Sequence, residues 1–157
     1  KGGAAVEITN ADSLLAHTKI SSDGKFIISS DAVKVIDITG ADKYPDLKKS
    51  NAYVVTSLNY RHWDTWEDGK FDHVFVTPLV NGKPGTPKDI MAGEPHDCPQ
   101  KPFGGDEDFI WHPDGKRIVY VTKKKFGTAY AVSTNTDLFE YDITTGITKN
   151  QTEDNKG

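Results

Sequence analysis

A hairpin phrase occurs twice in this chain, and a repeated hairpin constrains the fold more than any other feature. Residues 20–29, Ile-Ser-Ser-Asp-Gly-Lys-Phe-Ile-Ile-Ser, are echoed by residues 111–120, Trp-His-Pro-Asp-Gly-Lys-Arg-Ile-Val-Tyr. In each copy an Asp-Gly pair precedes an apolar segment, which predicts a β-hairpin because glycine adopts a positive φ without steric cost. A third Asp-Gly-Lys stands at residues 68–70. A hairpin that recurs within one chain predicts a repeat architecture built from strands.

The Asp-Gly pairs are spaced like the repeats of a β-propeller. They begin at Asp23, Asp68 and Asp114, so the offsets are 45 and 46 residues, close to the roughly 40–45 residues of a propeller blade. The segment after Lys70 nevertheless matches the second hairpin of a blade, because it ends in an Asn-Gly turn at residues 81–82. The sequence therefore favours two enlarged blades with a period of 91 residues, from Asp23 to Asp114, over three compact blades.

The predicted fold is all-β, an incomplete propeller of about two enlarged antiparallel blades with one short helical insertion. The helix is expected to open at residues 44–49, with Pro45 near its first turn. Residues 1–15 are a partly ordered lead-in, 16–106 the first blade with its insertion and long Pro-rich loop, and 107–157 a second blade truncated before the next. Strands are predicted at 16–21, 25–30, 33–38, 71–79, 86–91, 107–112, 117–123, 128–133, 137–143 and 147–152.

Composition excludes several classes of function. The chain has 157 residues and a net charge of −4, and no apolar run approaches membrane-spanning length, so no membrane insertion is expected. No basic patch with interleaved aromatic residues is visible, so no nucleic acid is expected as a partner. The basic run at residues 123–125 is interpreted as a solvated strand end rather than a phosphate site.

No cofactor or metal ion is predicted. The side chains that could be imagined as metal ligands lack the paired short spacings of structural zinc sites; they are His96, Asp97, Cys98 and His112. Cys98 is the only cysteine and cannot form a disulfide within the chain. Asp23 and Asp114 are interpreted as turn formers that accept local backbone N–H bonds.

Both ends of the chain favour a piece of a larger protein. The sequence begins with Lys-Gly-Gly without a methionine, and residues 151–157 form a polar connector that would lead to a further strand. Propellers close with about four to eight blades, and closure protects the edges of their strands. Two or three blades cannot close, so open strand edges are expected to allow self-association or pairing with the missing part.

Two segments resemble the propeller of serine peptidases of the prolyl-oligopeptidase (S9) family. Residues 60–70 read Tyr-Arg-His-Trp-Asp-Thr-Trp-Glu-Asp-Gly-Lys and are followed by His-Val-Phe-Val at 73–76. Residues 102–111, Pro-Phe-Gly-Gly-Asp-Glu-Asp-Phe-Ile-Trp, precede the second Asp-Gly hairpin. The pattern is most similar to acylaminoacyl-peptidase and dipeptidyl-peptidase 5 type enzymes, and it extends over roughly residues 16–157. The first hairpin departs from it, because Ser21-Ser22 stands where Trp-x-Pro or Ser-Pro is usual.

The resemblance implies a propeller that caps a C-terminal α/β-hydrolase domain of the same parent chain, where a Ser-Asp-His triad cleaves short peptides. No serine of this chain is flanked by glycine at both −2 and +2, so the Gly-x-Ser-x-Gly elbow is absent and no catalytic residue is expected here. The implied role is to gate the access of short peptides, and the family implies export to the periplasm. The alternative is a TolB-like propeller that serves as a scaffold for protein partners, in which case no hydrolase domain would follow.

Four residues are candidates for contact with substrate. Arg61 and Trp63 could form a wall near the interdomain cavity; the structural alternative packs Trp63 and Trp66 between blades and pairs Arg61 with Asp64. On that alternative, Arg61→Ala mainly destabilises the blade.

Glu107 and Asp108, with Asp106, could supply a negative end for a substrate ammonium, or could simply form a capped turn at the start of a strand.

Overall fold

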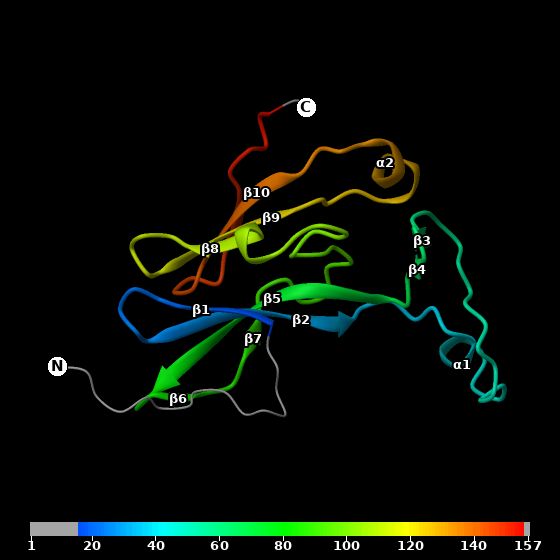
Figure 1. The fold of residues 1–157 in the computed structure, drawn as a ribbon, viewed down its shortest axis with the longest axis horizontal. Helices are drawn as coiled ribbons and strands as arrows, with labels where there is room; N and C mark the ends of the chain where they lie inside the picture. Colours follow the sequence, from blue (N-terminus) through cyan, green and yellow to red (C-terminus); the bar gives the residue numbers. More distant parts are fainter. Residues whose placement is uncertain (1–15, 156–157) are drawn as a thin grey trace.

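Two larger antiparallel sheets lie face to face as two layers (Figure 1). The structure is a computed structural model that describes residues 16–155, so the predicted lead-in lies outside the described residues. In the first sheet the order is β1-β2-β5-β6, with β7 also paired to β5; in the second it is β11-β10-β9-β8. The strands of the first sheet are β1 (Ala16–Ile20), β2 (Phe26–Lys34), β5 (Lys70–Val80), β6 (Lys83–Pro84) and β7 (Lys88–Asp89). The strands of the second are β8 (Phe109–Trp111), β9 (Arg117–Thr122), β10 (Asp137–Asp142) and β11 (Thr148–Asn150). The predicted all-β class is confirmed.

The repeated phrase forms the first hairpin of each sheet. β1 pairs with β2 and β8 pairs with β9, both antiparallel, around turns in which Gly24 has φ +69° and Gly115 φ +67°. In both turns the aspartate accepts a hydrogen bond from the backbone N–H two residues later, at 3.1 Å for Asp23 and 2.9 Å for Asp114. The third phrase differs, because the strand that follows it, β5, pairs with β2 rather than with the strand before it. It therefore opens no sheet of its own.

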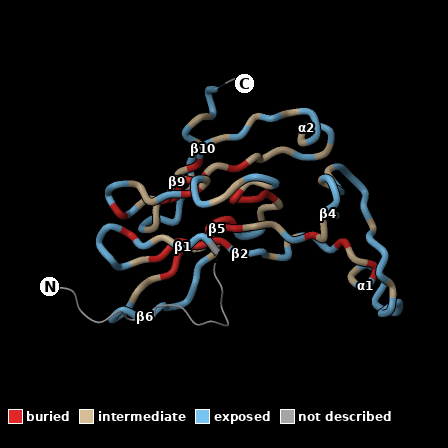
Figure 2. Tube along the Cα trace, in the orientation of Figure 1, coloured by how far each residue is buried: buried red, intermediate tan, exposed pale blue. Residues whose placement is uncertain are grey.

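The core lies between the two sheets, where Figure 2 shows the buried residues. Strict alternation along β9 buries Ile118, Tyr120 and Thr122 and turns the intervening side chains outward. Phe139 and Tyr141 on β10 bury the same face. Phe109 on β8 joins them, the first sheet contributes Ile28, Val74 and Val76, and the connection between the sheets contributes Ile90, Met91 and Cys98.

A buried histidine fastens the connection between the sheets to β5. His73 is fully buried; its Nδ1 lies 2.8 Å from Asp89 Oδ2, and its Nε2 lies 2.8 Å from the carbonyl oxygen of Glu94. A carbonyl oxygen only accepts, so Nε2 donates. On the other side, the Thr122 hydroxyl donates to the carbonyl oxygen of Asp97 at 2.8 Å. The connection is thus held to both layers.

Residues 35–69 form an arm that extends sideways from the two sheets (Figure 1). The arm carries α1 (Gly40–Lys43) and a two-stranded hairpin of β3 (Arg61–His62) and β4 (Thr65–Trp66). A capping box starts α1: Thr39 accepts from the N–H of Asp42, and the Asp42 carboxylate accepts from the N–H of Thr39. The predicted helix at 44–49 is wrong, because the capping box places the start earlier and the residue before Pro45 disfavours the α conformation.

Three strand predictions are also corrected. In place of the strand predicted at 128–133 the chain forms α2 (Gly127–Val132), and β9 is already paired on both sides by β8 and β10, so it offers no edge to a further strand. The separate strand at 33–38 does not form: β2 runs on to Lys34, and beyond it the N–H groups of Val35 and Ile36 donate to the carbonyl oxygen of Gly69. At 107–112 a 3₁₀ helix, η1 (Asp106–Asp108), precedes the short strand β8.

No helix within the described residues is long and apolar enough to cross a membrane.

Candidate functional site

The arm hairpin presents an exposed aromatic tip. Arg61 pairs with Trp66 across the two strands, and Trp63 occupies the turn with φ +48°, a left-handed conformation that a bulky side chain rarely adopts. Trp63 is 67 % exposed and Trp66 is 49 % exposed. The Arg61 guanidinium lies 5.1 Å from the centroid of the Trp66 ring, whose other neighbour, Tyr60, stacks at 6.1 Å. Aromatic and guanidinium groups are thereby held together on the surface.

The aromatic tip contacts the Pro-rich loop that connects the sheets. The Trp63 ring meets the ring of Phe103 edge to face at 5.2 Å, and Phe103 is 77 % exposed. The two tryptophans therefore do not pack between the two sheets that the structure describes, and their packing between blades of a larger propeller stays a prediction. The hairpin lies on the arm, away from the interface of the two sheets, and among the described residues Arg61 contacts Trp66 and forms no ion pair with Asp64.

The predicted acidic candidates lie in η1, at the end of the same loop. Asp108 Oδ2 accepts a hydrogen bond from the Gln100 backbone N–H at 2.7 Å, which closes the loop. Asp106 contacts His17 through its carboxylate and Lys19 through its carbonyl oxygen. Both flanking carboxylates thus have partners within the chain, and Asp106 and Glu107 are exposed whereas Asp108 is half-buried.

An ion-pair cluster fixes the root of the loop against β5. Asp97 is only 5 % exposed; burial raises the pKa of its carboxyl, and the ammonium of Lys101 at 2.9 Å opposes that rise. Burial alone would lower the pKa of Lys101. The carboxylates of Asp97 and of Asp72, the latter at 3.6 Å, outweigh this effect, so the pKa of Lys101 is raised. Asp97 Oδ1 also accepts from the backbone N–H of Asp72 at 2.9 Å. These contacts therefore anchor the loop that carries Phe103 to β5.

Sequence reasoning missed a pocket of about 150 Å³ between the arm and the connection from β9 to α2. Its walls are mostly apolar, and the Glu67 carboxylate lines it together with Lys43 and Lys125. Glu67 is half-buried, and that burial raises the pKa of its carboxyl. No sequence signal marks this residue, because the pocket joins segments that are distant along the chain.

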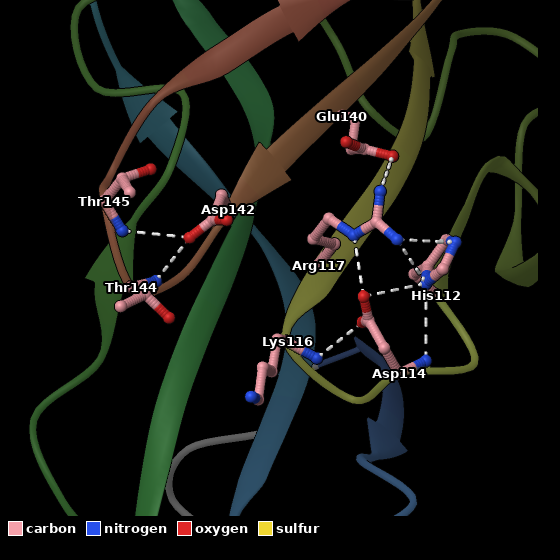
Figure 3. A network of polar contacts seen from close by, with 8 residues as sticks. All are labelled: His112, Asp114, Lys116, Arg117, Glu140, Asp142, Thr144 and Thr145. Carbon is pink, nitrogen blue, oxygen red and sulfur yellow. Dashed lines mark hydrogen bonds and ion pairs between the residues drawn. The ribbon is translucent and has the colours of Figure 1, made fainter.

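The polar network at the second Asp-Gly turn is internally satisfied (Figure 3). Arg117 donates to Asp114 at 2.7 Å and to Glu140 at 3.0 Å, and it also contacts the ring of His112. The Lys116 backbone N–H and the Arg117 guanidinium hold the pKa of Asp114 well below its usual range. These partners give the network a structural role.

The basic run departs from its predicted role as a solvated strand end. Lys124 pairs with Glu94 at 2.6 Å, and Lys123 donates to the carbonyl oxygen of Tyr130 at 2.6 Å. Among the residues that the structure describes, no three His, Cys, Asp or Glu side chains gather as metal ligands would.

Comparison with known proteins identifies relatives of one kind. The chain is 46 % identical over 112 residues to dipeptidyl-peptidase 5 of Porphyromonas gingivalis, covering 71 % of this chain and 16 % of that protein. It is 40 % identical over 133 residues to dipeptidyl-peptidase 5 of Porphyromonas endodontalis, covering 85 % of this chain and 19 % of that protein. A probable dipeptidyl-peptidase 5 of Emericella nidulans is 33 % identical over 81 residues, 47 % of this chain and 11 % of that protein.

No protein-family model matches the chain. It spans less than a fifth of the length of the curated relatives it matches. The similarity confirms the resemblance that residues 60–76 and 102–116 indicated. The chain is therefore a homologue of one segment of dipeptidyl-peptidase 5 and belongs with that group of proteins.

Proposed function

We propose that this chain is the non-catalytic, propeller-forming part of a serine exopeptidase, and that it gates the access of short peptides to a separate α/β-hydrolase domain. The observation that carries the proposal is the 46 % identity to a protein named dipeptidyl-peptidase 5 over a segment that lacks a Gly-x-Ser-x-Gly elbow. The chemistry of peptide cleavage would then reside outside this segment.

The arrangement of the sheets supports the propeller part of the proposal. Each large sheet is an antiparallel meander that opens with an Asp-Gly hairpin, and the two sheets stack face to face, as consecutive blades do. On the outward face of the second sheet, Ile110 is 49 % exposed and Leu138 40 % exposed. A further blade of the parent protein would cover these side chains. The boundaries 16–106 and 107–157 remain our proposal for the two blades.

The exposed aromatic tip supports the gating part. Arg61 and Trp63 extend from the arm rather than packing in the core, so they are available to a peptide or to the hydrolase domain of the same chain. Of the two acidic candidates we favour Glu107 for contact with substrate, because Asp108 is committed to the backbone N–H of Gln100.

The proposal is tested by comparing this chain with the protein encoded by the whole parent gene. Both are incubated with a serine-directed covalent probe and with dipeptidyl and acyl-aminoacyl chromogenic substrates. We expect the whole protein to be labelled by the probe and to cleave the substrates. The chain alone should show neither labelling nor cleavage. Labelling of the chain would place a nucleophile within it and contradict the proposal, and labelling of neither would favour a scaffold for protein partners.

A further inference from the structure

The pocket beside the arm has the size and walls of a site for one apolar group. Its volume of about 150 Å³ equals that of a cavity large enough to bind benzene. The walls come from three segments: Ile38 and Leu58 from the arm, Phe71 from β5, and Phe126 from the connection between β9 and α2. A ring or a branched alkyl group would fit among these side chains.

One carboxylate of the lining lacks a partner. Asp37 is paired with Lys34 at 3.4 Å, and Asp97 is paired with Lys101 at 2.9 Å. Glu67 makes no ion pair or side-chain hydrogen bond with any other residue that the structure describes. Burial of this carboxylate is costly, and the nearby charge of Lys101 offsets only part of the cost, because the pKa of Glu67 is still raised. A cation in the pocket would relieve that cost.

The two lysines of the lining do not fill this role. Lys43 is exposed at the end of α1 and its ammonium is free to remain hydrated. Lys125 is half-buried and lies beyond ion-pair distance of Glu67, since neither residue has a partner in an ion pair among residues 16–155. Among the described carboxylates that line the pocket, Glu67 is therefore the one without an ion-pair partner, and a ligand cation would compensate its burial.

We propose that this pocket binds an apolar primary amine, with the apolar group among Ile38, Leu58, Phe71 and Phe126 and the ammonium on the Glu67 carboxylate. The ion pair would form in a partly desolvated site, where a charge-assisted hydrogen bond is stronger than in water. A free amine and the amino end of a peptide with an apolar first residue share this chemistry. The inference does not depend on the proposed peptidase function.

The test is an NMR titration of the full chain with small probes that differ only in charge. Phenethylamine supplies the ring and the cation, 2-phenylethanol the ring alone, and 3-phenylpropionate the ring with an anion. We expect phenethylamine to shift the backbone amide signals of Gly69, Phe126 and Tyr130, with 2-phenylethanol binding about tenfold more weakly or less. The proposal would be overturned if phenethylamine and 2-phenylethanol bound equally well or if 3-phenylpropionate bound better than either. It would also be overturned if the shifted amide signals belonged to residues outside the pocket, or if no signals shifted.

Variants of the chain distinguish the contribution of the Glu67 charge to binding from that of the apolar side chains that line the pocket. Glu67→Gln should weaken phenethylamine binding by about tenfold and abolish the preference over the alcohol. Phe126→Ala should weaken both probes alike; Phe126 is 64 % exposed, so the change spares the core. Glu153→Gln, at an exposed carboxylate outside the pocket, is the matched control. Unchanged binding by Glu67→Gln would also overturn the proposal.

Phenylalaninamide distinguishes the two kinds of amine that share this chemistry. If it binds more tightly than phenethylamine, the site is assigned to the amino ends of peptides; if it binds more weakly, the site is assigned to free amines.

Discussion

The rings of Trp63 and Phe103 meet edge to face with their centroids 5.2 Å apart, although they belong to different parts of the chain. Trp63 lies at the tip of the arm hairpin and Phe103 in the loop before η1. Both side chains are largely exposed, so the pair links the arm to the loop without being buried in a core. This contact positions the aromatic tip relative to the acidic residues of η1.

A double-mutant cycle measures the strength of that link. Trp63→Ala, Phe103→Ala and the double variant are compared by urea unfolding. We expect a coupling free energy of about 0.5–1.5 kcal/mol, as edge-to-face pairs give in other proteins. Additive effects of the two substitutions would mean that the rings do not interact in solution.

Arg61→Ala is expected to change the free energy of unfolding by no more than about 1 kcal/mol, the range of an exposed cation–π contact. The exposure of Arg61 thus reverses the sequence-based expectation that this substitution mainly destabilises. Arg117→Ala is the comparison, because it removes the partner of both Asp114 and Glu140 and should destabilise more. A larger loss from Arg61→Ala than from Arg117→Ala would restore the sequence-based interpretation.

Glu67→Gln should stabilise the chain near neutral pH. Burial raises the pKa of Glu67 in the folded state above that of the unfolded chain, so the folded state binds the proton more tightly and loses stability as pH rises through the two values. The glutamine variant lacks this loss. The difference between the two midpoints of thermal unfolding should therefore be largest near neutral pH and shrink as pH falls below the ordinary range for glutamate. A difference that is independent of pH would argue against a perturbed carboxyl.

Gly69→Ala should be far more damaging than Gly82→Ala. Both glycines have positive φ, +83° and +74°, which costs alanine about 1–2 kcal/mol. At Gly69 an added Cβ would also lie 2.0 Å from the carbonyl oxygen of Ile36, whereas at Gly82 no atom lies within 4 Å. We expect Gly82→Ala to lose about 1 kcal/mol and Gly69→Ala at least about 3 kcal/mol, measured by urea unfolding. Similar losses at the two positions would contradict the close approach of the two ends of the arm at Ile36 and Gly69.

Local chemistry explains what the sequence predicted correctly. The Asp-Gly turns at Gly24 and Gly115, and the apolar strand that follows each turn, arise from residues that are adjacent or nearly adjacent in the chain. Such features need only a turn residue and a strand-forming apolar segment, and both can be recognised in the sequence. The same short phrases carried the resemblance to dipeptidyl-peptidase 5 that the comparisons confirmed.

Contacts between distant segments decided the rest. The helix α2 forms where a further strand would find no free edge on β9, and Trp63 is exposed because its hairpin lies on the arm rather than between the sheets. The pocket at Glu67 exists only where the arm, β5 and the approach to α2 converge. The sequence by itself determined the hairpins and the family, since these depend on local turn chemistry and short motifs. The tertiary structure alone decided which side chains are buried, paired or left open to a ligand, because burial and charge pairing are set by the neighbours that packing brings together.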